Sequence, residues 1–424
     1  MRKTKVKIGI LTIGNELTSG RIQDTNSALI SRAMQEQGWP VVAMLSVGDD
    51  NGAIHDALDF LLARAGAVIA TGGLGPTADD ITTAAIAKAF GLSLRMDDSI
   101  LTHIRELFAK RRLAWTENNT KQALFPEGAQ IIANPTGTAA GFAVRREGKI
   151  VAVIPGVPAE ARRMLPEGVV PLIRKAFPET ALHVETSTFK LFGIPEAAVD
   201  AALADADLAG LGLGVGFYPS FPENHLVLTA RTTSAEEAGR KLREAGARVE
   251  ARLGKYIFAR GPETLEGLVA RMLTEKKLSL AVAESCTGGL ITDRLTDIPG
   301  SSGFLERGVV TYSNASKTAL LGVPEAVLAE YGAVSEETAC LMAEGVRRLS
   351  GTNLGLAVTG IAGPSGGTEA KPVGTVHIAL ADGEKTLCRQ HALRWDRRRN
   401  KIAAAQTALL MLLRYLSGDV GADR

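Results

Sequence analysis

The chain has 424 residues, of which 46% are hydrophobic and 22% charged, a composition typical of soluble globular proteins that bury large cores. Its 48 Lys and Arg residues nearly balance 46 Asp and Glu residues, and the formal charge of +2 gives no overall field that would recruit nucleic acid or an anionic membrane. The length exceeds one ordinary core and predicts about three domains, since domains average roughly 150 residues.

Three cysteines, Cys286, Cys340 and Cys388, lie far apart and form no Cys-x-x-Cys pair. Neither a disulfide framework nor a thiolate zinc site is indicated, and we expect a cytoplasmic protein. No run of about 18 apolar residues occurs, so we expect no transmembrane helix and no membrane partner. The short apolar run in "MRKTKVKIGILTIG" predicts a first strand rather than a leader.

The first third of the chain alternates strand and helix patterns. Short apolar or β-branched runs at 5–13, 40–47 and 67–71 are separated by "NSALISRAMQEQ" and "NGAIHDALDFLLARA", which predicts a parallel sheet covered by helices. Two of these strands end in the loops "GNELTSGRIQDTN" and "TGGLGPTADD", and a later strand is "IVAVIPG". Because open α/β sheets bind ligands at the carboxyl ends of their strands, we expect a site there.

The next segment is predicted to form a small α+β unit. From about residue 182 the patterns run strand, helix, strand, strand, helix, strand, which is the order of a split βαβ layer. The Gly-x-x-Gly loop of a KH module is absent, so we expect no nucleic-acid partner. "ARGPETLEG" follows as a boundary, with Thr264 predicted as a simple helix N-cap because Gly267 cannot complete a capping box.

The last third alternates again. "KLSLAVAES", "FLERGVVTYS", "NLGLAVTG" and "VGTVHIALA" are predicted strands, and "TGGLITDRLTD", "SEETACLMAEGVRRLS" and a long segment from about Arg398 are predicted helices. We therefore predict an α/β protein, with two α/β domains of mainly parallel sheets joined by a small α+β domain. The predicted boundaries are 1–175, 176–260 and 261–424.

A serine and a cysteine stand together where an apolar run meets two glycines, in "AVAESCTGGL". Ser285 lies at a predicted strand-to-helix turn, where main-chain N–H groups can stabilise an anion. A serine nucleophile needs a base, and Lys317 in "YSNASK" could serve if burial lowers its pKa, with Tyr312 as proton relay or orienter. A Ser–Lys dyad is one interpretation of these two segments.

Simpler interpretations stay open. Ser285 at such a turn is most often a helix N-cap, Lys317 alone is typical of a solvated helix residue, and Tyr312 alone of a half-buried strand residue. Cys286 is most simply a small buried hydrophobe. The spacing in "YSNASK" is one residue too long for a Tyr-x-x-x-Lys pair, and neither Gly-x-Gly-x-x-Gly after a strand nor a Walker A sequence occurs, which disfavours hydride transfer and P-loop phosphoryl transfer.

Several motifs together resemble the CinA family of competence/damage-inducible proteins over nearly the whole chain. "AESCTGG", "VVTYSNASK", "VTGIAGPSGGT" and "KPVGTV" are similar to that family's nicotinamide-nucleotide amidase domain, and "GNELTSGRIQDTNS", "TGGLGPTADDIT", "NPTGTAAGF" and "IPGVPAE" to its molybdopterin-binding-like domain. The resemblance implies a hydrolase of pyridine nucleotide salvage, whose C-terminal domain deamidates nicotinamide mononucleotide to nicotinic acid mononucleotide and ammonia without a cofactor.

Carried over residue by residue, the resemblance implies Ser285 as nucleophile, Lys317 as general base and Tyr312 as its helper. The substrate-binding residues that it implies in this domain are Thr287, Gly288, Gly289, Thr359, Gly360 and Arg397. In the terminal segment "WDRRRNK", Lys401 replaces an arginine of the family pattern. If that arginine grips the substrate phosphate, lysine keeps the charge but loses the bidentate fork, unless Arg398 or Arg399 compensates.

For the N-terminal domain the resemblance implies a metal-dependent ADP-ribose pyrophosphatase. A pyrophosphate needs N–H donors and a cation. The expected binding residues in "TGGLGPTADD" are Gly72, Gly73, Gly75 and Thr77. Asp49 and Asp80 are the candidate ligands of a divalent metal ion of unknown identity, although Asp79 and Asp80 also suit the first turn of a helix.

Two classes of function follow. In the first, the protein is a homodimer with hydrolase sites for nicotinamide mononucleotide and ADP-ribose. The alternative is a nucleotide- or pterin-binding regulatory protein in which one or both sites are inactive. A role in DNA uptake, suggested only by the family's name, gains no support from charge or motif.

Overall fold

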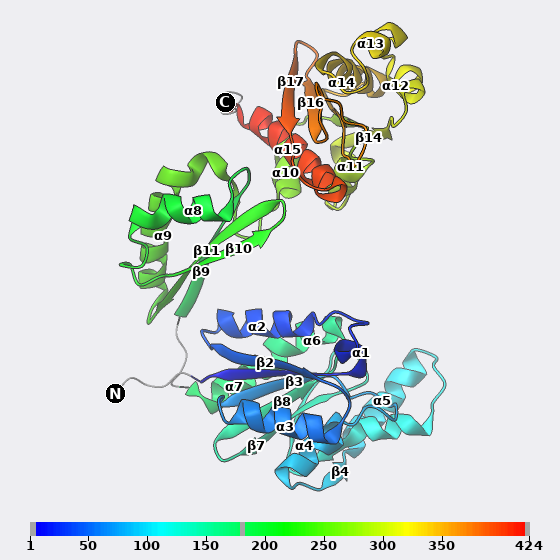
Figure 1. Cartoon of the computed structure of the whole chain (residues 1–424). Helices are drawn as coiled ribbons and strands as arrows, with labels where there is room; N and C mark the ends of the chain where they lie inside the picture. The colour runs from blue at the N-terminus through cyan, green and yellow to red at the C-terminus, as the bar shows by residue number, and fades with distance from the viewer. Residues whose placement is uncertain (1–5, 179–182, 420–424) are drawn as a thin grey trace. The chain divides into compact units, whose positions relative to one another are not determined.

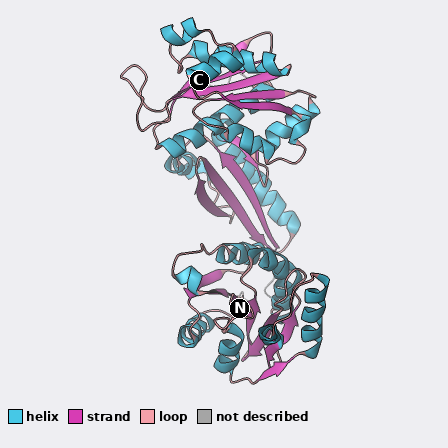
Figure 2. Ribbon diagram, turned by 90° about the vertical axis from the view of Figure 1, so that its right-hand side faces the viewer, coloured by secondary structure: helices cyan, strands magenta, loops and turns pink. Residues whose placement is uncertain are grey.

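The computed structural model describes residues 6–178 and 183–419 (Figure 1). The chain forms two compact units, residues 1–185 with 230–240 and residues 186–229 with 241–424. In both α/β domains, helices lie on either side of the central sheet (Figure 2). The predicted fold class, two α/β domains and a small α+β domain, is confirmed. Within the described ranges, no helix combines the length and apolar character that crossing a membrane requires.

The N-terminal domain is built on a six-stranded sheet in the order β2-β1-β3-β8-β7-β6. Four strands of this sheet are parallel, namely β1 (Ile8–Ile13), β2 (Val41–Val47), β3 (Ala67–Thr71) and β8 (Lys149–Ile154). Strand β7 (Gly141–Arg146) pairs antiparallel with β8, and β6 (Gln130–Ile132) pairs antiparallel with β7. A separate pair is formed by β4 (Leu94–Met96) and β5 (Leu124–Pro126). The sequence patterns miss β4, β5 and β6, because runs of three residues are too short to show alternation, and they also miss β7, which begins with a glycine and ends in two arginines.

Alternating residues along these strands fill one core on each face of the sheet. Ala67 and Ile69 of β3 pack on the side of α2, α6 and α7, whereas Val68 and Ala70 pack on the side of α3 and α4. The helices and helical turns of the domain are α1 (Asn15–Thr18), α2 (Asn26–Glu36), α3 (Asn51–Leu62), α4 (Thr82–Phe90), α5 (Asp98–Lys110), η1 (Glu117–Ala123), α6 (Pro158–Met164), η2 (Leu165–Val169) and α7 (Val170–Ala176).

The small α+β segment has the predicted βαββαβ order. Its elements are β9 (His183–Leu191), α8 (Glu196–Leu203), β10 (Gly214–Ser220), β11 (Glu223–Thr232), α9 (Ala235–Leu253) and β12 (Ile257–Arg260). The four strands form one sheet in the order β10-β11-β9-β12. Strands β10 and β11 pair antiparallel with Ser220 opposite Glu223, so this hairpin turns at Phe221 and Pro222.

The C-terminal domain has a five-stranded sheet in the order β14-β13-β15-β16-β17. Strand β13 (Leu280–Glu284) runs parallel to β14 (Leu305–Val310) and β15 (Leu354–Gly360), and β16 (Thr375–Ala381) and β17 (Thr386–Ala392) are antiparallel. The sequence patterns miss β17, because Cys388, Arg389 and Gln390 give this edge strand little apolar alternation.

Helices cover both faces of this second sheet. On one face Leu280 and Val282 pack with α10 (Leu265–Glu275), α11 (Leu290–Thr296) and α15 (Arg397–Ser417). On the other, Ala281 and Ala283 pack with α12 (Asn314–Leu321) and α14 (Glu336–Ser350), and α13 (Glu325–Glu330) precedes α14. Thr264 caps α10 as predicted, since its hydroxyl accepts the Gly267 N–H at 3.1 Å.

Candidate functional site

Ser285 and Lys317 meet at the carboxyl edge of the C-terminal sheet. Ser285 follows β13, and its N–H donates to the Val358 carbonyl oxygen of β15 at 2.9 Å, which fixes the backbone at the strand end. Lys317 lies in α12, and its Nζ is 3.1 Å from Ser285 Oγ and 2.7 Å from the Thr311 carbonyl oxygen. The two residues that were paired from the sequence therefore lie within hydrogen-bond distance.

The surroundings of Lys317 disfavour its charged form. The side chain is 1% exposed, and this burial lowers the pKa of the amine below its usual value. Among the described residues, the Cys286 thiol is the one group that opposes the shift, and no carboxylate pairs with the amine. The expectation that Lys317 is a solvated helix residue is wrong, because α12 turns this face toward the sheet. A neutral amine beside a serine hydroxyl can act as a base.

The N-terminus of α11 is capped by Glu284 and not by Ser285. The buried Glu284 carboxylate accepts the N–H groups of Gly289 at 3.0 Å, Ile291 at 3.1 Å and Thr292 at 2.8 Å, and also the Thr292 hydroxyl at 2.8 Å. The N-cap interpretation of Ser285 is therefore wrong. Sequence reasoning missed Glu284, although an acidic residue just before a helix start is a known signal for a stabilised N-terminus.

The turn between Ser285 and α11 leaves two backbone donors open. Gly288 and Gly289 have φ of 66° and 95°, a left-handed conformation that favours glycine. The Gly288 N–H donates to the Ser285 carbonyl oxygen at 3.2 Å, and the Gly289 N–H is taken by Glu284. Among the described residues, no backbone carbonyl accepts the N–H groups of Cys286 and Thr287. This turn therefore offers candidate main-chain donors for an anion, which the sequence predicted for this junction.

Cys286 is unsuited to nucleophilic chemistry. It is buried in the core between the sheet, α10 and α15, and burial raises the pKa of its thiol to about 12. A thiol with so high a pKa carries almost no thiolate at neutral pH. The interpretation of Cys286 as a small buried hydrophobe is confirmed, and Ser285 is left as the candidate nucleophile.

Arg397 connects two loops beside the dyad. Its Nη2 donates to the Tyr312 hydroxyl at 2.9 Å, and its Nη1 donates to the Gly363 carbonyl oxygen at 2.6 Å. Tyr312 follows β14 and is 61% exposed, so it is not a half-buried strand residue. No hydrogen bond joins Tyr312 to Ser285 or Lys317 in the described chain, and its contact with Arg397 favours the orienting role over the relay.

The remaining predicted residues of this domain differ in what they contact. Lys401, one helical turn beyond Arg397, places its Nζ 3.4 Å from where a Cβ on Gly288 would lie. The Thr359 hydroxyl donates to the Ala333 carbonyl oxygen at 2.6 Å. A Cβ on Gly360 would come 2.7 Å from Val376, so this glycine is needed for close strand packing. The substrate-binding roles of Thr359 and Gly360 stay predictions.

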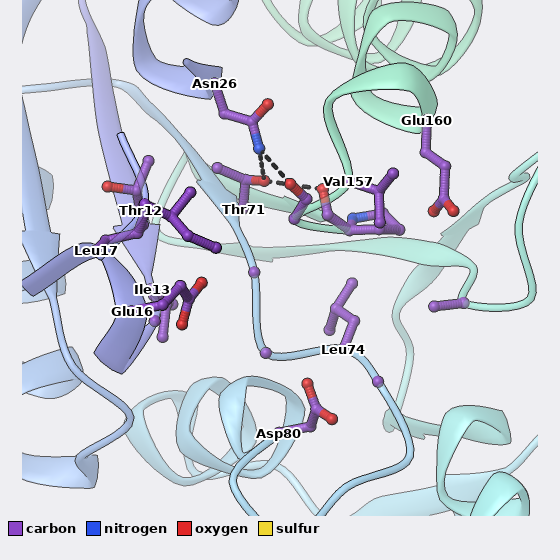
Figure 3. A pocket seen from close by; sticks show the side chains of 18 of the residues that line it. Thr12, Ile13, Glu16, Leu17, Asn26, Thr71, Leu74, Asp80, Val157 and Glu160 are labelled. Atoms are coloured by element: carbon purple, nitrogen blue, oxygen red, sulfur yellow. Dashed lines mark hydrogen bonds between the residues drawn. The ribbon is translucent and has the colours of Figure 1, made fainter. Parts of the chain in front are cut away.

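A cavity of about 570 Å³ lies at the carboxyl ends of β1, β3 and β8 in the N-terminal domain (Figure 3). The structure brings most of the predicted residues together there, namely Gly72, Gly73, Gly75, Asp49 and Asp80. Thr77 does not line the cavity, because its N–H, at 2.9 Å, and its hydroxyl both donate to the Asp80 carboxylate. The loop that was chosen from the sequence lines the cavity, with Thr77 bonded to Asp80, and its role in ligand binding stays a prediction.

The glycine loop is packed too closely for side chains. A Cβ on Gly72 would lie 2.1 Å from the Ile13 carbonyl oxygen, and one on Gly73 would lie 2.1 Å from Thr82 Oγ1. Helix α4 begins only at Thr82, so the expectation that Asp79 and Asp80 occupy its first turn is wrong. Both aspartates belong to the irregular loop that precedes the helix.

The pKa of Asp49 is raised above its usual value. Burial is the main cause, the Asn15 N–H at 2.9 Å opposes it, and the charges of Glu16, Asp79 and Asp80 raise the pKa further. Within residues 6–178 and 183–419, no three Asp, Glu, His or Cys side chains lie close enough together to hold a metal ion by themselves. The metal-ligand roles of Asp49 and Asp80 therefore stay predictions.

The opposite wall of the cavity was not predicted from the sequence. Asn26 Nδ2 donates to Thr71 Oγ1 at 3.2 Å and to the Gly156 carbonyl oxygen at 2.7 Å, and these bonds join α2 to the ends of β3 and β8 (Figure 3). Glu160 of α6 also lines the cavity and accepts the Asn134 amide at 2.7 Å. The loops that carry Asn26 and Gly156 were expected at this edge of the sheet, but no local pattern indicates these particular side-chain contacts.

Comparison with known families divides the chain into three matches. The probable molybdopterin binding domain matches residues 9–175, the damage-inducible protein CinA KH domain matches 186–259, and the CinA C-terminal domain matches 262–416. The middle match occurs although the Gly-x-x-Gly loop of KH modules is absent from that segment. This is why sequence reasoning did not identify it.

Similar proteins extend over almost the full chain. A CinA-like protein of Syntrophus aciditrophicus is 63% identical over 97% of this chain and 98% of its own length, and one of Geobacter sulfurreducens is 44% identical over 97% and 99%. Among solved structures, the competence damage-inducible protein A of Klebsiella pneumoniae is 35% identical, with 36% of this chain and 95% of that chain covered and a TM-score of 0.36.

Proposed function

The chain belongs to the CinA family, and we propose that its C-terminal domain hydrolyses the carboxamide of nicotinamide mononucleotide to give nicotinic acid mononucleotide and ammonia. The observation that carries the proposal is the buried Lys317 amine, which has no carboxylate partner in the described chain and lies 3.1 Å from Ser285 Oγ. Amide hydrolysis needs an activated nucleophile, donors for an oxyanion and a proton for the leaving amine.

In the first half of the proposed reaction, the neutral Lys317 amine takes the proton of the Ser285 hydroxyl as Oγ attacks the carboxamide carbon. The negative charge that develops on the carboxamide oxygen is stabilised by the open N–H groups of Cys286 and Thr287. The carbon–nitrogen bond then breaks, and Lys317 returns its proton to the departing nitrogen, so ammonia leaves and an ester on Ser285 remains.

In the second half, Lys317 takes a proton from water, and the hydroxide attacks the ester carbonyl carbon at the same site. The ester bond breaks, Ser285 Oγ regains the proton from Lys317, and nicotinic acid mononucleotide is released. We propose that Arg397 and Lys401 bind the substrate phosphate. Arg397 contacts the loop at Gly363, and Lys401 Nζ lies close to Gly288 in the turn that follows Ser285. The amidase step requires no cofactor in this proposal.

The amidase proposal is tested by product analysis of the purified full chain with nicotinamide mononucleotide. We expect ammonia and nicotinic acid mononucleotide in equal amounts, with turnover unchanged by EDTA. Nicotinamide and the intact dinucleotide serve as comparison substrates, since the first lacks a phosphate and the second carries a bulky one. Binding of the mononucleotide without release of ammonia would instead support the regulatory binding protein.

For the N-terminal domain we propose that the cavity binds ADP-ribose and that its pyrophosphate bond is hydrolysed there. The support is the meeting of the close-packed glycine loop with Asp49 and Asp80 in one cavity of about 570 Å³. The two aspartates would hold a divalent cation together with phosphate oxygens, and the cation would neutralise the pyrophosphate charge. A pterin or nucleotide bound without cleavage is the competing proposal for the same cavity.

This second activity is tested by following AMP and ribose 5-phosphate after ADP-ribose is added with Mg²⁺ or Mn²⁺. Asp49→Asn and Asp80→Asn are expected to reduce the rate at least tenfold, while Asp56→Asn, an exposed position on α3, should leave it unchanged. Calorimetric binding of ADP-ribose with no cleavage at any metal concentration would contradict hydrolysis and favour a binding role.

A further inference from the structure

The tip of the β10–β11 hairpin contacts the chain at the start of α15. The rings of Phe221 and Trp395 are 5.3 Å apart between centroids with an interplanar angle of 76°, an edge-to-face contact. The Arg399 guanidinium lies 5.3 Å from the centroid of the Phe221 ring. Phe221 and Trp395 remain 39% and 45% exposed, so this contact lies at the surface and is not part of a core.

A second contact anchors the same hairpin by a chain of polar groups. Glu223, at the start of β11, accepts a hydrogen bond from Gln406 Nε2 of α15 at 3.0 Å. Gln406 is fully buried, and its Oε1 accepts from Arg294 Nη2 of α11 at 2.7 Å. The hairpin is therefore joined to both α15 and, through Gln406, α11. Helix α11 follows the turn after Ser285, and α15 begins at Arg397.

The backbone at Trp395 is held rigidly to the site loops. The buried Asn400 side chain accepts the Trp395 N–H at 3.1 Å and donates to the Trp395 carbonyl oxygen at 2.9 Å and the Ala362 carbonyl oxygen at 3.1 Å. Two residues after Trp395, Arg397 makes its bridge to Tyr312 and Gly363. A displacement of Trp395 would therefore be passed directly to Arg397.

We propose that the hairpin tip is a positioning element of the C-terminal site, with Phe221 acting through Trp395 to fix the first turn of α15 and the orientation of Arg397. The kinetic part of this inference rests on the proposed amidase function, whereas the structural part does not. Phe221 touches no reacting atom, so removal of its ring weakens substrate binding and leaves the chemical step intact. We expect KM to rise roughly threefold to tenfold, which is the effect of losing one aromatic contact.

The structural part is tested by amide hydrogen exchange of residues 395–401 in the full chain without substrate. We expect Phe221→Ala to speed exchange in this segment several-fold. Tyr218→Ala is the matched control, because Tyr218 lies on the same hairpin with its ring against Gly216 of its own strand, and it should change nothing. Unchanged exchange in folded Phe221→Ala overturns the inference. If that variant does not fold, Phe221→Leu, which retains bulk but no ring, replaces it.

The kinetic part is tested with nicotinamide mononucleotide in a double-mutant cycle of Phe221→Ala and Trp395→Ala. We expect Phe221→Ala to raise KM with kcat unchanged, Phe221→Tyr to restore it, and Phe221→Ala to have no further effect once Trp395 is alanine. Additive effects, or a fall in kcat alone, contradict action through Trp395. If exchange responds as expected while the parent chain releases no ammonia, the positioning role stands and the amidase proposal fails.

Discussion

Lys317 Nζ lies 3.1 Å from Ser285 Oγ and 2.7 Å from the Thr311 carbonyl oxygen, in surroundings that leave the lysine 1% exposed. The carbonyl oxygen can accept one N–H of the amine, and burial disfavours the ammonium form. A lysine with a lowered pKa is neutral in a larger fraction of molecules than a solvated lysine, so it accepts the serine proton more readily. The chemical proposals for this domain depend on this pair.

The amidase is expected to lose activity on the acid side. Because burial lowers the pKa of Lys317, kcat/KM should be low where the amine is protonated, rise as pH increases through the lowered pKa, and level off at a lower pH than it would with a solvated lysine. A pH profile of ammonia release from nicotinamide mononucleotide checks this. An optimum at acidic pH, with activity falling toward neutrality, would contradict a lysine base.

Lys317→Met is expected to abolish activity and yet stabilise the fold at neutral pH. The folded chain with a neutral Lys317 binds one proton fewer than the unfolded chain at any pH between the lowered pKa and 10.5. The free energy of unfolding of the parent therefore rises with pH in that window, by at most about 1.4 kcal/mol per pH unit relative to the variant. Urea unfolding at several pH values measures the difference, and parallel curves would refute it.

Glu284→Gln is expected to disturb the Ser285 turn. The glutamine amide keeps one acceptor oxygen but turns a donor toward N–H groups of Gly289, Ile291 or Thr292, so kcat should fall about tenfold or more and unfolding should become easier by about 1–3 kcal/mol. Thr292→Val is the control, since it removes one hydroxyl and leaves all three amides bound. Equal behaviour of the two variants in kcat would argue against a role for the Glu284 cap.

Arg397→Lys tests the bridge between the two site loops. Lysine keeps the charge but cannot reach both the Tyr312 hydroxyl and the Gly363 carbonyl oxygen with one planar group. We expect KM for nicotinamide mononucleotide to rise roughly tenfold, a loss of about 1.4 kcal/mol, with a smaller effect on kcat. Arg398→Lys, at an exposed neighbouring position, should leave both constants unchanged.

The sequence is sufficient for the larger elements and for the pairing of the two site segments. Near-continuous apolar runs such as 67–71 and 280–284 predict buried strands. Because Ser285 and Lys317 each follow a strand of one parallel sheet, their meeting at one edge is expected. The short strands β4, β5 and β6, the strand β7 and the edge strand β17 carry too little pattern to be predicted. The residue that caps the N-terminus of α11 was misassigned. Serine and glutamate can both accept the N–H groups at a helix start, and only the direction of each side chain decides between Ser285 and Glu284.

Contacts between distant segments could not be predicted from local patterns. Arg397 donates to Tyr312 across 85 positions, and Asn26 donates to Gly156 across 130. Their segments were each expected near a site, but no periodicity or motif indicates these hydrogen bonds. The same is true of the contact between Phe221 and Trp395, which depends on how the hairpin docks on α15. These contacts are determined by tertiary packing, which cannot be calculated from local sequence patterns.

The most direct test of the dyad is ammonia release from nicotinamide mononucleotide by the parent chain, Ser285→Ala and Lys317→Met, without added metal. We predict turnover in the parent and a loss of roughly a thousandfold or more in each variant, with circular dichroism unchanged. Turnover in Ser285→Ala at the rate of the parent would contradict the dyad, because the proposed reaction forms its ester on Ser285 Oγ.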